Sequence, residues 1–207
     1  MFLSLAIGAI YQTLRIGGYE VFGPGPQGLV TQEPLKLGRE PAQVGISEGP
    51  NRVPHPSDTR FELERVALYD IVGRVVSTRF YAFDPYRDIM PIDVGVAFGE
   101  ALVDQPGVKI WHGNRFLKFQ YSGSWSPSAA WLNGLTNNHM IPSSPNLLRA
   151  LRSLEKNDFI RMKGELVNVW HQGQRVSTTS VTREDREGGA CEIIWLKSLQ
   201  VGNRVYY

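Results

Sequence analysis

Apolar and charged residues alternate with period two between residues 159 and 170. This period is typical of a strand that buries one face and exposes the other. Gly164 falls on the predicted inner face, at a position where a strand can bend to close a barrel. The inner face carries Ile160, Met162, Leu166 and Trp170, and the outer face carries Arg161, Lys163 and Glu165.

Further strands are predicted on both sides of this segment. Residues 67–81 are rich in β-branched and aromatic side chains and predict a long strand bent near Gly73. Two apolar runs within residues 108–121 flank Gly113 and Asn114, which favours a hairpin with a short turn. We also expect a surface loop at residues 122–138, a strand at 175–182 and a last strand at 191–201.

One amphipathic helix is predicted at residues 145–156. Ser144 is suited to cap it, and Pro145 suits its first turn, where a missing N–H leaves no hydrogen bond unmade. Asn157 tolerates the left-handed conformation that often ends a helix. The apolar face comprises Leu147, Leu148, Leu151 and Leu154.

The order of these elements predicts a mainly β (α+β) fold. We expect a small OB-like barrel of about five to seven strands, with one amphipathic helix before the penultimate strands. SH3-like and other α+β barrels share this order and remain alternatives.

The chain divides into three regions by composition. Residues 1–16 are apolar and are a candidate membrane anchor, although a spanning helix needs about 20 apolar residues. Residues 17–60 are rich in proline and glycine and predict a linker, with an arm that wraps the domain as the alternative. Residues 61–207 form the predicted domain. We expect it to be anchored in a membrane and extracytoplasmic, with a cytoplasmic location as the alternative.

Composition excludes several classes of function. The 207-residue chain is 42% hydrophobic, which is enough for one full core. The net charge of +2 does not indicate binding to nucleic acid through bulk charge. A single cysteine excludes an intrachain disulfide and a cysteine-rich zinc site, and the four histidines lack the spacing of metal ligands. We therefore expect no metal and no cofactor.

Several segments of the chain resemble a family of bacterial proteins. They lie at residues 90–93, 138–142, 157–167, 180–185 and 189–192. Members of that family carry an N-terminal membrane segment, a proline-rich linker and one extracytoplasmic β-rich domain. The resemblance implies this architecture for the present chain and implies no activity.

Cys191 and His139 are the candidate catalytic pair, because an imidazole can activate a thiol nucleophile. The predicted fold places His139 just before the helix and Cys191 at the start of the last strand, and Asp185 is a candidate to orient the imidazole. The alternative is that Cys191 is a small buried apolar residue and His139 a loop residue.

Candidate ligand-binding residues are cationic and aromatic. Cationic strands interleaved with aromatic residues are used to hold single-stranded nucleic acid, and they also describe the ordinary outer face of a barrel. Carboxylates at Asp84, Asp88, Asp93 and Glu100 are expected to be solvated loop charges. The candidate ligand-binding residues are Trp111, Arg161, Lys163 and Arg183.

The sequence favours a non-enzymatic, membrane-tethered domain that binds a protein or a polar ligand. The first alternative is an OB-type protein that binds single-stranded nucleic acid. The second alternative is a thiol hydrolase that uses Cys191 and His139.

Overall fold

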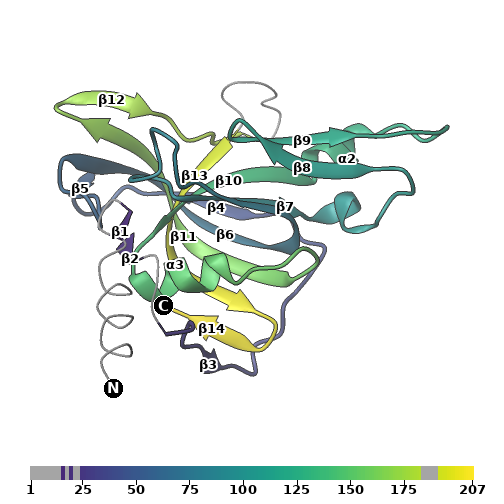
Figure 1. The fold of residues 1–207 in the computed structure, drawn as a ribbon, viewed down its shortest axis with the longest axis horizontal. Helices are drawn as coiled ribbons and strands as arrows, with labels where there is room; N and C mark the ends of the chain where they lie inside the picture. Colours follow the sequence, from purple (N-terminus) through teal and green to yellow (C-terminus); the bar gives the residue numbers. More distant parts are fainter. Residues whose placement is uncertain (1–14, 17–18, 21–23, 183–190) are drawn as a thin grey trace, which may run out of the picture.

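The computed structural model describes residues 15–16, 19–20, 24–182 and 191–207. It is mainly β, with one large sheet that mixes parallel and antiparallel pairs (Figure 1). In its central part each strand pairs with the next, and the last strand pairs again with the first. In pairing order these strands are β6 (Phe61–Phe80), β7 (Ile92–Ala97), β10 (Leu135–Pro142), β13 (Cys191–Val201) and β11 (Phe159–His171).

Glycine allows two close approaches between these strands. A Cβ at Gly73 of β6 would lie 2.4 Å from the carbonyl oxygen of Ala97 in β7. A Cβ at Gly164 of β11 would lie 2.3 Å from the carbonyl oxygen of Trp195 in β13, where the register shifts. Both positions therefore require glycine, because a side chain there would keep the bent strand from approaching its neighbour.

The predicted helix is present as α3 (Pro145–Arg152), and it covers one end of the sheet (Figure 1). Ser144 caps it by accepting a hydrogen bond from the backbone N–H of Leu147 at 3.1 Å. It ends four residues earlier than expected, and Asn157 takes the left-handed conformation at φ 79° in the following turn. The predicted leucine face is confirmed, because Leu147, Leu148, Leu151 and Leu154 are all buried.

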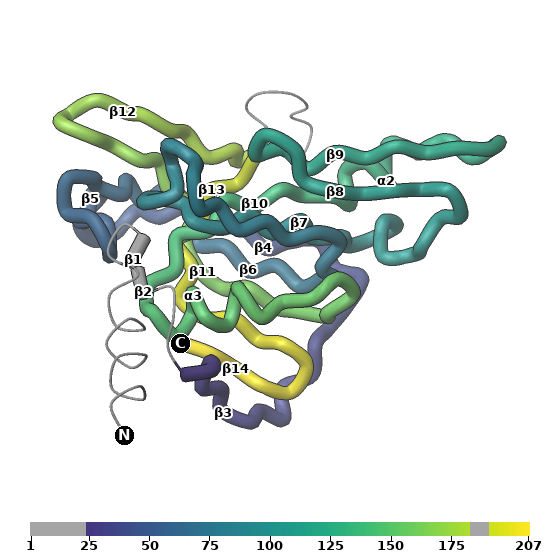
Figure 2. The backbone as a smooth tube through the Cα atoms, viewed as in Figure 1, coloured from purple at the N-terminus to yellow at the C-terminus, as the bar shows by residue number. Residues whose placement is uncertain are grey.

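The predicted hairpin is confirmed as β8 (Lys109–Gly113) and β9 (Phe116–Gln120), which project from the sheet (Figure 2). Its turn residues are Asn114 and Arg115, at φ 52° and 63°, one residue later than expected. The prediction of a loop through residue 138 is wrong, because this segment contains α2 (Ala129–Asn133) and the first half of β10. Trp131 of α2 is buried against the hairpin, and this long-range packing orders the segment.

Residues 29–54 run along the sheet as an arm. They supply short edge strands, as expected for a segment broken by proline. The edge strands are β3 (Leu29–Val30), which pairs with β14 (Arg204–Tyr206), and β4 (Ala42–Gly45) and β5 (Arg52–Pro54), which both pair with β6.

The remaining elements are short. No helix in the described ranges is long and apolar enough to cross a membrane, and residues 1–14 of the candidate anchor lie outside those ranges. The remaining short elements are β1 (Arg15–Ile16), β2 (Tyr19–Glu20), the 3-10 helix η1 (Gly99–Leu102) and β12 (Gln174–Ser177).

Apolar residues cover both faces of the β7–β10–β13 part of the sheet. One cluster lies against α3 and includes Met140 and Ile194. A second cluster on the opposite face includes Met90, Ile141 and Ile193. Along β10 and β13, polar side chains alternate with the residues of the first cluster. These polar side chains therefore lie on the face of the second cluster, and the candidate site is found there.

Candidate functional site

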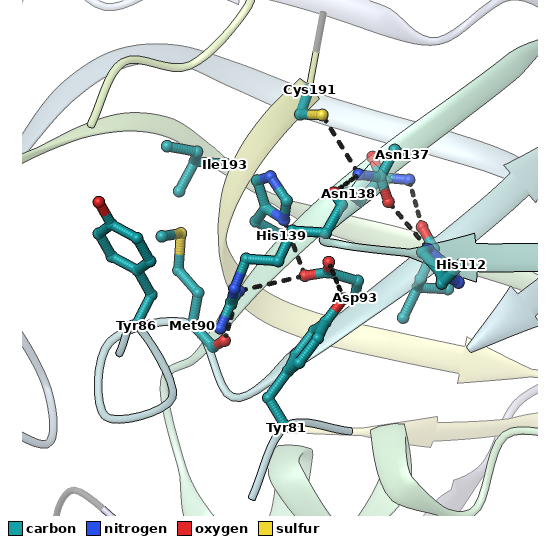
Figure 3. A network of polar contacts seen from close by, with 12 residues as sticks. Tyr81, Tyr86, Met90, Asp93, His112, Asn137, Asn138, His139, Cys191 and Ile193 are labelled. Atoms are coloured by element: carbon teal, nitrogen blue, oxygen red, sulfur yellow. Dashed lines mark hydrogen bonds and ion pairs between the residues drawn. The ribbon is translucent and has the colours of Figure 1, made fainter. Parts of the chain in front are cut away.

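Strand register brings Cys191 close to His139. β10 and β13 run parallel, with Asn137 opposite Cys191 and His139 opposite Ile193. Residues two apart on a strand share a face, so Asn137, His139 and Cys191 project to the same side of the sheet. Figure 3 shows the imidazole of His139 between Cys191 and Asp93.

Asp93 is the carboxylate that orients His139. The two residues lie directly opposite each other in the antiparallel pair of β7 and β10. Nδ1 of His139 lies 2.7 Å from Oδ1 of Asp93, and Asp93 is fully buried. Asp185, the residue expected in this role, lies outside the described residues.

Two further donors compensate the buried charge of Asp93. The Tyr81 hydroxyl donates to Oδ2 of Asp93 at 2.8 Å, and Nη1 of Arg115 lies 3.6 Å from Oδ1. Burial, together with the charge of Asp93, raises the pKa of Tyr81 above its ordinary value. Arg115 is also held by Asp84 and by the carbonyl oxygen of Met90, so its position is fixed. A buried carboxylate needs partners of this kind to replace its hydration.

The surroundings of His139 favour its protonated form. Burial opposes that charge, but the hydrogen bonds and charges of Asp93 and Cys191 outweigh it and raise the pKa of His139 to about 9. Because Nδ1 is bonded to Asp93, Nε2 is the nitrogen available to Cys191. The Asp93–His139 pair therefore presents an N–H donor to the sulfur atom.

Asn137 presents a second donor to the same sulfur. Its Nδ2 lies 2.7 Å from the carbonyl oxygen of Arg115 and 3.2 Å from Sγ of Cys191 (Figure 3). A backbone carbonyl can only accept a hydrogen bond, so the amide atom that faces it is the nitrogen. Sγ of Cys191 thus accepts from Asn137 on one side and faces the imidazolium of His139 on the other.

The candidate ligand-binding residues do not converge. Arg161 is held by both oxygens of Asp70, at 2.9 and 2.7 Å, and by Glu33, and these carboxylates raise its pKa. Lys163 lies next to it on a cavity of about 220 Å³ between β3, β11 and β13. Trp111 lies on the projecting hairpin, and Arg183 is outside the described residues.

The other polar candidates have structural partners. Across the described part of the chain, no group of three or more His, Cys, Asp or Glu residues could hold a metal ion. Asp84 binds Arg115, Asp88 lies beside Arg87, and Glu100 accepts a hydrogen bond from Ser128. The expectation of solvated loop charges is wrong for Asp93, which is buried, and for Asp84, which is ion-paired.

Sequence reasoning missed Asp93 and Asn137 as members of the site. A signal for Asp93 was present, because it is a single carboxylate between Ile92 and Val94 in an apolar run, and all three are buried. A charge in such a strand requires partners from elsewhere in the fold. For Asn137 no local signal exists, since its role depends on the parallel register of β10 and β13.

Comparison with protein-family models, with curated proteins and with solved structures finds no match to this chain. The chemistry of the site therefore has to be derived from its own geometry.

Proposed function

We propose that this protein is a cysteine-dependent acyl hydrolase in which Cys191 is the nucleophile. The observation that carries the proposal is the position of His139 between the buried carboxylate of Asp93 and the sulfur of Cys191. A nucleophile, a base within reach of it and a third group that orients the base are the parts shared by hydrolases of this type.

The same residues supply each step of acyl transfer. The Cys191 thiolate attacks the carbonyl carbon of the substrate, and a carbon–sulfur bond forms. The His139 imidazolium gives its Nε2 proton to the leaving group, whose bond to the acyl carbon breaks. Water then attacks the thioester while neutral His139 accepts a proton from that water, and the carbon–sulfur bond breaks to release the acid and restore the thiolate.

Asp93 has an orienting role in this scheme. Its bond to Nδ1 keeps Nε2 directed at Cys191 and stabilises the imidazolium in the resting state. Because the proton given to the leaving group comes from His139, turnover is expected to fall as the pH rises through about 9.

We also propose an OB-like barrel as the scaffold of this site. The closed order of pairing through β6, β7, β10, β13 and β11 supports it. Further support comes from the parallel pair of β10 and β13 and from the place of α3 between β10 and β11. In such a barrel the Cys191–His139 pair belongs to the outer face.

A non-enzymatic interaction domain, tethered to a membrane through residues 1–16, is the second candidate. Aromatic side chains exposed on β8 and β9 favour it, because Trp111, Phe116 and Phe119 are 41%, 42% and 36% exposed. The proposal of a nucleic-acid binder has less support, since Arg161 is already held by two carboxylates. In either case Cys191 would be a packing residue without unusual reactivity.

Acylation by p-nitrophenyl acetate tests the hydrolase proposal. Intact-mass analysis at pH 7 is expected to show one acetyl group, located on Cys191 by peptide mapping, which then disappears by hydrolysis. Cys191→Ser and His139→Gln are expected to abolish this adduct, whereas His171→Gln, at the end of β11, keeps it. A wild-type protein whose Cys191 is not acetylated while free cysteine in the same tube is acetylated would contradict the proposal.

A further inference from the structure

A chain of hydrogen bonds runs from Ser77 to the reacting sulfur through two buried side chains. Nδ1 of His112 lies 2.8 Å from Oγ of Ser77, and Nε2 lies 2.9 Å from Oδ1 of Asn137. Nδ2 of Asn137 continues the chain to Sγ of Cys191 at 3.2 Å (Figure 3). His112 and Asn137 are each only 6% exposed, so water does not compete freely for these groups.

The carbonyl oxygen of Arg115 fixes the direction of each hydrogen bond between Ser77 and Cys191. The carbonyl of Arg115 can only accept, so Nδ2 of Asn137 faces it and Oδ1 of Asn137 faces His112. His112 must then donate from Nε2. Burial lowers the pKa of His112 and favours its neutral form, which leaves Nδ1 to accept from the hydroxyl of Ser77.

We propose that Asn137 is a catalytic residue that stabilises the Cys191 thiolate, and that His112 is the positioning residue that holds the Asn137 amide nitrogen toward the sulfur. This inference rests on the proposed function and adds a second donor to it. If Asn137 turned over, its oxygen would face both the thiolate and the Arg115 carbonyl, and both contacts would be repulsive. The N–H of His112 opposes that rotation because it bonds the Asn137 oxygen.

Charged groups also lie near this relay, which comprises Ser77, His112 and Asn137, since Asp93, His139 and Arg79 act on His112 through their charges. Asp93, Arg115 and His139 act on the sulfur from the β7 side, through the imidazole. Asn137 acts from the opposite side and carries no net charge. The two donors therefore contribute separately, and the removal of one leaves the other in place.

The rate of Cys191 alkylation by iodoacetamide tests the relay. A hydrogen bond to a charged acceptor stabilises that acceptor, so its loss is expected to reduce the thiolate fraction. Asn137→Ala and His112→Leu are therefore each expected to slow alkylation at pH 7 about ten-fold. The limiting rate at high pH, where any thiol is ionised, is expected to stay unchanged. A purely structural role would alter accessibility and move that limiting rate as well.

His112→Gln provides the conservative comparison. The amide nitrogen of glutamine can replace Nε2 of histidine as the donor to Asn137, so most of the rate at pH 7 is expected to return. Circular dichroism and thermal melting establish that each variant is folded. If Asn137→Ala does not fold, the pair His112→Leu and His112→Gln decides the question. Equal rates for that pair would overturn the proposal.

The tautomer of His112 is a readout that needs no variant. Long-range proton–nitrogen NMR of the histidine-labelled protein is expected to show neutral His112 with its proton on Nε2. A proton on Nδ1 would overturn the relay even if the wild-type protein forms an acyl-enzyme. Conversely, a protein that forms no acyl-enzyme but loses alkylation rate in His112→Leu would retain the relay and lose the hydrolase function.

Discussion

The buried carboxylate of Asp93 is the residue on which the site depends. It is fully buried and contacts the Tyr81 hydroxyl, the His139 imidazole and the Arg115 guanidinium. An isolated charge in such a place would be strongly destabilising, but these partners replace its hydration. The partners come from the segment after β6, from β10 and from the hairpin turn. One carboxylate therefore fixes these parts of the fold around His139.

Asp93→Asn tests this role without a large change in shape. The amide cannot balance the imidazolium, so the pKa of His139 is expected to fall toward its ordinary value near 6.5. The free energy of unfolding at pH 7 is expected to drop by about 1–3 kcal/mol, because charge-assisted hydrogen bonds are lost. Urea titration measures the second effect and NMR titration of the imidazole measures the first. An unchanged His139 titration would mean that Asp93 does not hold the charge.

At the scale of elements, Gly164 determines how β11 and β13 meet. Gly164→Ala is expected to destabilise the protein by about 2–4 kcal/mol, because the new methyl group would overlap the carbonyl of Trp195 at 2.3 Å. Gly45→Ala is the matched control on β4, where nothing lies within 4 Å, and it is expected to change stability by less than about 0.5 kcal/mol. Equal effects in urea denaturation would show that the close approach is not essential.

A second prediction at the scale of elements concerns Gln27, just before the arm. The side-chain amide of Asn146 in α3 exchanges two hydrogen bonds with the backbone of Gln27, at 2.8 and 2.9 Å, as a neighbouring strand would. Asn146→Ala is expected to speed amide hydrogen exchange about ten-fold between residues 27 and 31, since one or two hydrogen bonds are lost. Exchange in β11 is the internal control and is expected to stay the same. Faster exchange in both places would indicate general destabilisation.

Helices and strands whose residues show a local periodicity could be predicted from the sequence, but the pairing of the strands could not. The strand at residues 159–170 and the leucine helix carry their period in consecutive residues, and both are present as β11 and α3. The short helix α2 was missed because its one buried residue, Trp131, is held by Phe119 and Trp125 rather than by its own neighbours. Cys191 and His139 could be named as a pair by residue type. The choice of Asp93 required the register of β7 against β10, which no local pattern contains.

For the whole molecule, the shifted pKa values of His55 and His139 predict how stability depends on pH. Burial lowers the pKa of His55 to about 4, although the hydrogen bond between its Nε2 and the Ile89 carbonyl oxygen, at 3.0 Å, opposes this shift. In the unfolded chain this group binds a proton near pH 6.5. As the pH falls from 6.5 toward 4, the unfolded state takes up a proton that the folded state does not. His55 therefore reduces stability on the acid side.

His139 acts in the opposite direction. Its folded pKa of about 9 lies above the unfolded value of about 6.5, so its contribution is complete below pH 6.5 and is lost as the pH rises through 9. Each histidine accounts for a change on the order of 3 kcal/mol across its own range. The free energy of unfolding is therefore expected to be greatest near pH 6.5 and to decline on both sides.

Two single variants test the acid and the alkaline parts of this pH dependence separately. His139→Gln is expected to flatten the decline between pH 6.5 and 9. His55→Gln is expected to reduce the decline between pH 6.5 and 4, to which the lowered pKa of His112 also contributes. Urea denaturation at half-unit intervals of pH gives both slopes. His171→Gln serves as the control, because its ring stacks on Phe61 outside both buried sites. A decline above pH 6.5 that persists in His139→Gln would show that the imidazolium of the candidate site does not stabilise the fold, and the charge state assigned to the Cys191–His139 pair would then be wrong.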